Sequence, residues 1–315
     1  MSGRFIHVRR SGLQTTVQDL GRWGFQAQGV PVAGPMDPFS HRFANALVGN
    51  DRNAATLEIT LVGPELEFEG DCLVAFAGAE FSVTVDGAEA AGCQPFRVPS
   101  HARLHFGSRR RGARAYLAVA GGIDAPLVLG SRATHVASAM GGWAGRPLHK
   151  DDRLPIGVAP ERPTARPRAR NHAHDTLLEP AVLRALPGPD ADRFDEEAAA
   201  VLQSAPYTVA ADSNRMGFRL RGPQLSLTRG ADIISDVTPT GTLQVPGTGQ
   251  PILLMADRQT AGGYPRIATV ISADLGIAGQ QAPGDTLSFR MCSPADAVSA
   301  LIARENALLA LEAGW

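Results

Sequence analysis

The stretch "GTLQVPGTGQPILLMADRQTAGGYPRIATVISADL", residues 241–275, contains three short apolar runs separated by glycine and proline. These runs, "TLQVPG", "PILLMA" and "RIATVIS", have the length and composition of β-strands. Short strands at this density favour a closed barrel over a sheet layered with helices. The stretch therefore predicts a β-barrel in the C-terminal half of the chain.

The same strand-and-turn texture recurs along the sequence. It is found in "ELEFEG", "FSVTVDG", "ARLHFG" and "RAYLAVAGG", and later in "PYTVAA", "DIISDV" and "DTLSFR". We expect "GSRRRGAR", residues 107–114, to be an exposed turn between two strands. Three helices are predicted, in "DPFSHRFANALVG" with Asp37 as N-cap, in "ADRFDEEAAAVLQS" and in "SPADAVSALIARENALLALEAG". The chain is therefore predicted to be mainly β with a few helices.

Ordered landmarks suggest two related units in tandem. A chain of 315 residues is long enough for about two domains. Four short motifs of the first half return in the same order in the second. The pairs are Gly63-Pro64 with Gly222-Pro223, Gln94-Pro95 with Gln250-Pro251, Gly121-Gly122 with Gly262-Gly263, and Asp152-Arg153-Leu154 with Asp285-Thr286-Leu287. We predict a first barrel over residues 1–160, a Pro- and Arg-rich linker over 161–176, and a second barrel with a C-terminal helix over 177–315.

The composition excludes several classes of protein. With 30 basic and 31 acidic residues, the net charge of -1 gives no steering towards nucleic acid or an anionic membrane. Cys72, Cys93 and Cys292 are odd in number and widely spaced, which indicates neither a disulfide framework nor a zinc site. The sequence shows no signal peptide and no membrane-spanning run. We therefore expect a cytoplasmic protein without a metal site of its own.

Two polar segments interrupt this pattern. In "PILLMADRQTAGGYP", residues 251–265, an apolar strand ends in Asp257 and Arg258, and buried charges need partners or a polar cavity. Gly262 and Gly263 are expected to let the backbone turn tightly after it. This segment therefore predicts the mouth of a ligand cavity.

The second polar segment is "TTVQDLGRWGFQAQGVPVAGPMDPF", residues 15–39, in which glycines lie among hydrogen-bonding side chains. Glycine lets a backbone approach a ligand closely. Asp19 and Arg22 could face such a ligand, or they could pair with each other and hold a long loop in place. The residues alone leave both interpretations open.

Seven longer stretches resemble, in order, the signature motifs of the KipA family, from about Gly12 to Phe289. They are "TTVQDLGRWG", "GPMDPFSHRFANALVGN", "TLEITLVGPELEF", "YLAVAGGID", "SNRMGFRLRGPQLS", "GTLQVPGTGQPILLMADRQTAGGYPRIATVISADL" and "QQAPGDTLSF". That family includes the C subunit of the bacterial ATP-dependent 5-oxoprolinase, and it is similar to part of the carboxyltransferase region of the biotin-dependent urea carboxylase. The resemblance implies tandem cyclophilin-like β-barrels.

The resemblance also implies an activity and partners. Two other proteins, one KipI-like and one of the LamB/YcsF type, would act with this chain, using ATP with magnesium to open the lactam of 5-oxoproline to glutamate. The ligand cavity would lie between the barrels or at the partner interface. Arginines would balance phosphate charge and an aspartate would orient a nucleophile. The residues implied for catalysis are Asp257, Asp37, Arg22 and Arg215, and those implied for substrate or nucleotide binding are Asp19, Glu58, Gln244, Arg258, Gln259, Thr260 and Tyr264.

Two positions depart from the family pattern. Asn214 stands where the family usually has aspartate, which removes an acid-base group, and Ala261 stands where it usually has threonine, which removes a hydroxyl.

Other functions stay open at this point. One is a carboxyltransferase component that moves carboxyl from carboxybiotin to urea or another small amide. Lys150 lies in "LHKDDR" and not in a Met-Lys-Met site, so biotin would have to arrive on another protein of the complex. A second is a non-catalytic regulator that binds a KipI-like kinase inhibitor. A third is a prolyl isomerase, which the fold alone does not support.

Overall fold

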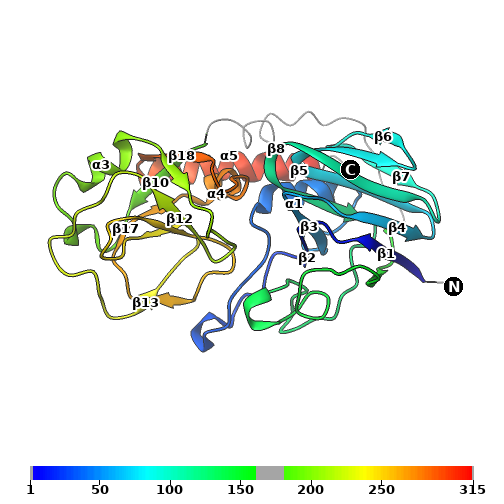
Figure 1. Ribbon diagram of the computed structural model, residues 1–315, viewed down its shortest axis with the longest axis horizontal. Coiled ribbons are helices and arrows are strands. Elements are labelled where there is room, and N and C mark those ends of the chain that lie inside the picture. Colours follow the sequence, from blue (N-terminus) through cyan, green and yellow to red (C-terminus); the bar gives the residue numbers. More distant parts are fainter. Residues whose placement is uncertain (1–2, 161–180, 314–315) are drawn as a thin grey trace. The chain divides into compact units, whose positions relative to one another are not determined.

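The computed structural model describes residues 3–160 and 181–313, which fall into two compact units (Figure 1). Unit 1 lies within Met1–Arg22, Ala33–Leu178 and Asn306–Trp315, and unit 2 lies within Trp23–Val32 and Glu179–Glu305. The predicted linker, residues 161–176, lies outside the described residues. Each unit is described by itself below.

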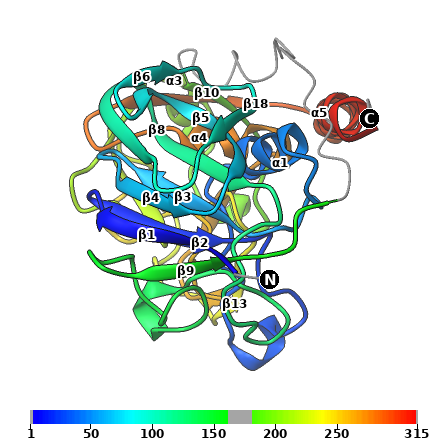
Figure 2. The same cartoon turned by 90° about the vertical axis from the view of Figure 1, so that its right-hand side faces the viewer.

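Unit 1 is built on a nine-stranded sheet with the order β2-β3-β8-β4-β1-β9, in which β5 pairs with β8 and also with β6 and β7. Figure 2 shows β1 between β4 and β9. The strands are β1 (Arg4–Arg10), β2 (Gln14–Gln18), β3 (Thr56–Thr60), β4 (Glu65–Glu69), β5 (Cys72–Val85), β6 (Ala88–Ala90), β7 (Phe96–Val98), β8 (Arg103–Val119) and β9 (Arg153–Ile156).

The core of unit 1 follows the alternation of these strands. In the antiparallel pair of β1 and β4, Ile6 faces Phe68 and Val8 faces Leu66, and all four side chains are fully buried. Successive side chains of a strand point to opposite faces, so the polar residues between them face outward.

The long segment after β8, residues 120–152, covers the two end strands of this sheet order. Thr134 N donates to Val17 O of β2 at 3.0 Å and Leu148 N donates to Thr15 O at 2.8 Å. At the other end, an isolated bridge joins Ile123 to Ile156 of β9. Because open strand edges are sites of unwanted pairing, this loop protects both ends of the sheet. It includes the short helix η2 (Val136–Ser138).

Helix α1 (Pro38–Leu47) begins where the sequence predicts. Asp37 is the N-cap, its side chain accepts from Ser40 N, and a proline occupies the first turn. The helix packs against β5 and β8, and Phe39, Phe43 and Leu47 are buried.

Unit 2 contains a closed barrel with the strand order β10-β17-β14-β15-β12-β11-β18. The parallel pairing of β10 with β18 is part of this ring, and its other pairings are antiparallel. The strands are β10 (Ala181–Pro187), β11 (Tyr207–Val209), β12 (Gly217–Arg221), β14 (Thr242–Gln244), β15 (Ile252–Leu254), β17 (Arg266–Val270) and β18 (Thr286–Met291), and a separate pair is formed by β13 (Asp236–Val237) and β16 (Ala261–Gly262). The predictions of a mainly β chain and of a barrel in this half are confirmed.

Helices interrupt the strands of unit 2. They are η1 (Gln26–Gln28), η3 (Ala191–Arg193), α3 (Ala198–Ser204), η4 (Ser272–Asp274), α4 (Leu275–Gly279) and α5 (Pro294–Ala313), whose last residues group with unit 1. Ser293 and Asp296 cap α5 reciprocally, because Asp296 N donates to Ser293 Oγ at 3.2 Å and Ser293 N donates to Asp296 Oδ2 at 3.1 Å.

Three local predictions need correction. Residues 107–114 are not a turn, because β8 is one continuous strand of 17 residues and register shifts along its pairing with β5 take up the irregularity. The predicted second helix is helical as α3 only in its C-terminal half, after the separate turn η3. "DIISDV" forms a strand only at Asp236–Val237.

Among the described residues, no helix is both long enough and apolar enough to cross a membrane.

Candidate functional site

The predicted strand at residues 251–256 is observed as β15 of the closed barrel. It pairs with β12 on one side and with β14 on the other. After it ends, Met255 N donates to Met216 O at 3.0 Å and Asp257 N donates to Arg215 O at 2.8 Å. These backbone hydrogen bonds place Asp257 next to Arg215, which lies 42 residues earlier in the sequence.

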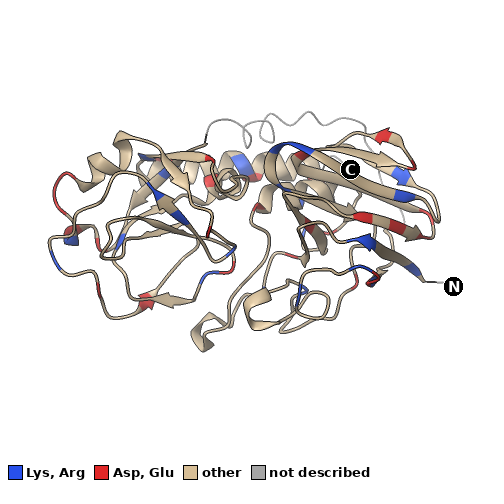
Figure 3. Ribbon diagram, in the orientation of Figure 1, with Lys and Arg blue, Asp and Glu red and all other residues tan. Residues whose placement is uncertain are grey.

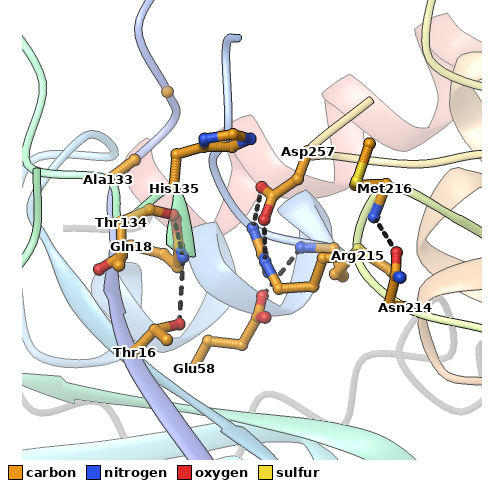
Figure 4. A network of polar contacts seen from close by, with 12 residues as sticks. Thr16, Gln18, Glu58, Ala133, Thr134, His135, Asn214, Arg215, Met216 and Asp257 are labelled. Carbon is orange, nitrogen blue, oxygen red and sulfur yellow. Dashed lines mark hydrogen bonds and ion pairs between the residues drawn. The ribbon is translucent and has the colours of Figure 1, made fainter. Parts of the chain in front are cut away.

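Arg215 and Asp257 form a forked ion pair (Figure 4). Arg215 Nε donates to Asp257 Oδ2 and Arg215 Nη2 donates to Asp257 Oδ1, both at 2.9 Å. The two side chains are 5% and 6% exposed. A fork of this kind is strong and geometrically specific, so it fixes both groups in one orientation. Catalytic roles for these two residues stay predictions.

Arg258 has a different partner from its neighbour. Its Nε donates to Thr238 O at 2.7 Å, and burial lowers the pKa of its guanidinium below the usual value. Thr238 in turn donates from Oγ1 to Gln259 O at 2.6 Å, and its backbone N donates to Thr260 O at 3.1 Å. The segment that follows β15 is therefore held against Thr238.

A pocket of about 180 Å³ lies next to this segment within unit 2. Three of the predicted binding residues line it, namely Gln244, Gln259 and Tyr264, together with Thr238 and Asn214. Asn214 Oδ1 accepts from Met216 N at 2.8 Å (Figure 4). The lining therefore offers carboxamides and hydroxyls, which both donate and accept hydrogen bonds. The structure brings Gln244, Gln259 and Tyr264 together, whereas Asp257, Arg258 and Thr260 are not part of this lining.

The glycine pair after β15 does not make the predicted tight turn. Gly262 belongs to β16, and neither Gly262 nor Gly263 is among the described residues with a left-handed backbone. The need for glycine at position 262 comes instead from its close contact with Gln244, because a Cβ on Gly262 would lie 2.6 Å from Gln244 Nε2. Any larger residue would therefore displace the carboxamide that lines the pocket.

The predicted site residues of unit 1 lie among buried polar contacts. Glu58 Oε2 accepts from Tyr116 Oη at 2.7 Å and from Met36 N at 2.9 Å. The same hydroxyl of Tyr116 accepts from Asp37 N at 2.8 Å. Burial above all, and then the charge of Glu58, raise the pKa of Tyr116 well above its usual value, so this tyrosine stays a neutral donor.

Asp37 acts as a helix cap in this structure. Its Oδ1 accepts from Ser40 N at 3.0 Å and its Oδ2 accepts from Ser40 Oγ at 2.5 Å. The side chain is fully buried. Its implied role in orienting a nucleophile stays a prediction.

Asp19 and Arg22 both hold the loop that follows β8. Asp19 accepts from Gly21 N, Ser131 Oγ and Arg132 N. Arg22 Nε donates to Val128 O at 3.0 Å and its Nη2 donates to Ala133 O at 2.8 Å. These hydrogen bonds hold the loop, but the expected pair between Asp19 and Arg22 is not among them, and the ligand-facing role of both residues stays a prediction.

Sequence reasoning did not select the polar residues around the end of β2. Gln18 Nε2 donates to Thr16 Oγ1 and to Thr134 O, each at 3.1 Å (Figure 4). Its Oε1 and His135 Nε2 are buried without a hydrogen-bond partner among the described residues. Gln18 stands in the quoted segment 15–39, whereas His135 lies in a loop without a recognisable motif.

No group of three or more His, Cys, Asp and Glu side chains suited to a metal ion occurs in the described part of the chain. Among ionisable groups near the predicted residues, His41 is strongly perturbed. Its pKa is lowered to about 4, mainly by burial, while the nearby charge of Asp19 acts in the opposite direction. His41 Nδ1 lies 2.9 Å from Thr56 Oγ1, so a neutral ring is held within the core.

Comparisons with known proteins agree with the motifs. A family model described as "Carboxyltransferase domain, subdomain A and B" matches residues 28–291. The chain is 41% identical to the C subunit of 5-oxoprolinase from Escherichia coli K12, over 94% of each protein. It is 33% identical to the C subunit of 5-oxoprolinase from Haemophilus influenzae, over 93% of this chain and 92% of that protein.

Among solved structures, the urea carboxylase of Kluyveromyces lactis matches 99% of this chain with a TM-score of 0.92 and 32% identity. The urea amidolyase of the same yeast matches 99% with a TM-score of 0.91. This chain spans 29% and 20% of those two proteins. The resemblance found in the motifs is confirmed, and the chain belongs to the family of carboxyltransferase domains with subdomains A and B.

Proposed function

We propose that the chain is the C subunit of an ATP-dependent 5-oxoprolinase. It acts with two partners, a KipI-like protein and a LamB/YcsF-type protein, to open 5-oxoproline to glutamate. The observation that carries this proposal is the 41% identity to a protein named as the C subunit of 5-oxoprolinase, which extends over 94% of both chains. A match over whole lengths favours an equivalent subunit over a shared domain in an unrelated protein.

The pocket of unit 2 suits the substrate side of this reaction. A lactam presents one N–H donor and one carbonyl acceptor, and the carboxamides of Gln244 and Gln259 can pair with both. Its volume of about 180 Å³ is small beside the roughly 300–1,000 Å³ of pockets for drug-sized ligands. The pocket therefore favours a small amide.

The same pocket does not fit a nucleotide. Its volume is too small for a nucleotide, even though Arg219 is part of the lining. The proposal therefore leaves ATP and magnesium to the assembled complex and derives no step through them in this chain.

The test is ATP hydrolysis that depends on 5-oxoproline, measured for the chain alone, for each candidate partner, and for the three mixed. We expect negligible turnover by the isolated chain and full turnover by the mixture. Omission of this chain from the mixture is the control. Full turnover by the chain alone contradicts the proposed need for partners. Equal turnover by a mixture that lacks this chain contradicts its proposed role as a subunit of the enzyme.

A carboxyltransferase component is the second candidate, favoured by the TM-score of 0.92 to a urea carboxylase. In that function a biotinyl group carried by another protein of the complex delivers carboxyl to urea or another small amide. Transfer from carboxylated biotin to urea, dependent on this chain, would support this function in place of lactam opening.

A further inference from the structure

A gap in strand pairing opens a second pocket, in unit 1. Strand β5 pairs with β8 from Val74 to Val85, while its other edge pairs with β7 at Val74 and with β6 at Val83. Between these two points, eight residues of β5 (75–82) face a return segment of five (91–95), which joins Ala90 to Phe96. No described strand pairs with this edge of β5 over that interval. Cys93 N still donates to Phe76 O at 2.8 Å, but a return segment three residues shorter cannot follow the whole interval in register, so the two separate beyond Phe76.

The space left between them measures about 560 Å³. This lies within the roughly 300–1,000 Å³ typical of small-molecule sites. Small residues surround it, among them Ala77, Ala79 and Ala91, so a ligand can approach the backbone of β5. Gly92 lies directly on the ring of Phe76, where a Cβ would come within 2.8 Å of Cε2. The pocket is therefore bounded at both ends by paired strands and has an aromatic ring on one side.

Charges of both signs line this pocket on different strands. Glu89 lies on β6 and Arg110 on β8, and both are exposed. Figure 3 shows the acidic position on β6 and basic positions along β8. Glu80 of β5 also lines the pocket, and it lies in register with Arg111 of β8, where opposite charges on paired strands attract each other. Glu89 and Arg110 thus remain to face a ligand from two sides.

We propose that this pocket binds a small zwitterion of the α-amino acid class. The ligand's carboxylate pairs with the Arg110 guanidinium and its ammonium group pairs with the Glu89 carboxylate. The half-buried hydroxyl of Thr84 is available for a further hydrogen bond, whereas Ser82 Oγ already lies 3.1 Å from Ser108 Oγ. The paired strands at both ends limit the ligand to a compact molecule and exclude a peptide strand that runs through. This inference does not depend on the activity proposed above.

The thiol of Cys93 provides the readout, because it lines the pocket and is half-buried. We would measure by mass spectrometry how fast iodoacetamide modifies Cys93 in the full chain, with L-glutamine or L-glutamate as probe. Cys292, also half-buried but in unit 2, is the internal reference. We expect saturable protection of Cys93, several-fold at saturation, with an unchanged rate at Cys292.

5-Oxoproline is the matched comparison ligand, since its nitrogen is an uncharged amide. We expect it to leave the Cys93 rate unchanged. Equal protection by 5-oxoproline and by the amino acids would overturn the zwitterion assignment, and so would an absence of protection by either amino acid.

Two variants that each remove one charge test whether Glu89 and Arg110 bind the ligand. Glu89→Gln and Arg110→Gln should each raise the half-protecting concentration about tenfold, as expected when a charge-assisted hydrogen bond is lost. Arg109→Gln is the control, because Arg109 is exposed on the same strand and is not in the pocket lining. An effect of Arg109→Gln as large as that of Arg110→Gln, or wild-type protection in both charge variants, would overturn the proposal.

Discussion

Two buried aspartates, one in each unit, are stabilised in different ways. Asp257 of unit 2 is held by the guanidinium of Arg215 through two hydrogen bonds of 2.9 Å. Asp19 of unit 1 is held by two backbone N–H groups and the hydroxyl of Ser131. Both aspartates are buried. A carboxylate can thus be buried against a full charge or against several dipoles, and the two arrangements respond differently when the charge is removed.

The largest effect is expected for Asp257→Asn. The change leaves the buried guanidinium of Arg215 without its fork, and breaking a buried pair costs about 3–5 kcal/mol of unfolding free energy. Denaturant unfolding measures this loss. The double variant Asp257→Leu with Arg215→Met is the control, and it should be more stable than Asp257→Asn because it removes both charges of the buried pair. An unchanged melting temperature with activity of the assembled complex lowered roughly 100-fold would instead assign Asp257 to a ligand site.

Acid should destabilise unit 1 through His41, whose charge state is coupled to Asp19. Burial lowers the pKa of His41 from 6.5 to about 4, so the folded state favours the neutral ring. The unfolded chain binds the proton more readily, and stability is therefore lost as the pH falls from about 6.5 towards 4. The loss is roughly 1.4 kcal/mol per pH unit within that window, or about 2 kcal/mol between pH 7 and pH 5.

Unfolding free energies at these two pH values test the His41 prediction. In His41→Gln the dependence should flatten, although the variant starts from a lower stability. An equally steep dependence in that variant would assign the acid effect to other groups.

A smaller loss is expected for Asp19→Asn. The amide retains one acceptor oxygen for the donors that surround it, but it cannot accept from all three in the same geometry. We expect a loss of about 1–2 kcal/mol, below that of Asp257→Asn, because no buried cation is left behind. Calorimetry of the two variants side by side measures the difference. A loss at Asp19 equal to that at Asp257 would break the distinction between the two kinds of burial.

The smallest effect is expected for an exposed pair of unit 2. Arg219 Nε lies 3.1 Å from Asp212 Oδ2, with both side chains more than half exposed. Exposed pairs contribute little because water screens them. Arg219→Gln should change the unfolding free energy by less than about 0.5 kcal/mol. A loss above about 1 kcal/mol in denaturant unfolding would contradict this expectation.

Part of the candidate site could be predicted from the sequence motifs alone. Gln244, Gln259 and Tyr264 were implied by the motif resemblance, and they do line one pocket. Tyr116 was missed, because a tyrosine inside the apolar run "RAYLAVAGG" looks like an ordinary core residue. Its hydroxyl joins Glu58 to Asp37 N only after β3 and β8 have paired and α1 has packed on them.

The sequence by itself determined much of the local structure of this protein. Apolar runs of strand length between glycines and prolines specified the β texture, and Asp37-Pro38 specified the start of α1, because these signals act over a few neighbouring residues. Long-range pairing was decided only by the tertiary structure. Asp257 lies beside Arg258 in sequence yet pairs with Arg215, since the antiparallel pairing of β12 with β15 brings together the residues just beyond the two strand ends, which are 42 positions apart. Local pattern carries no information about register between distant strands, and that register decides which charges meet.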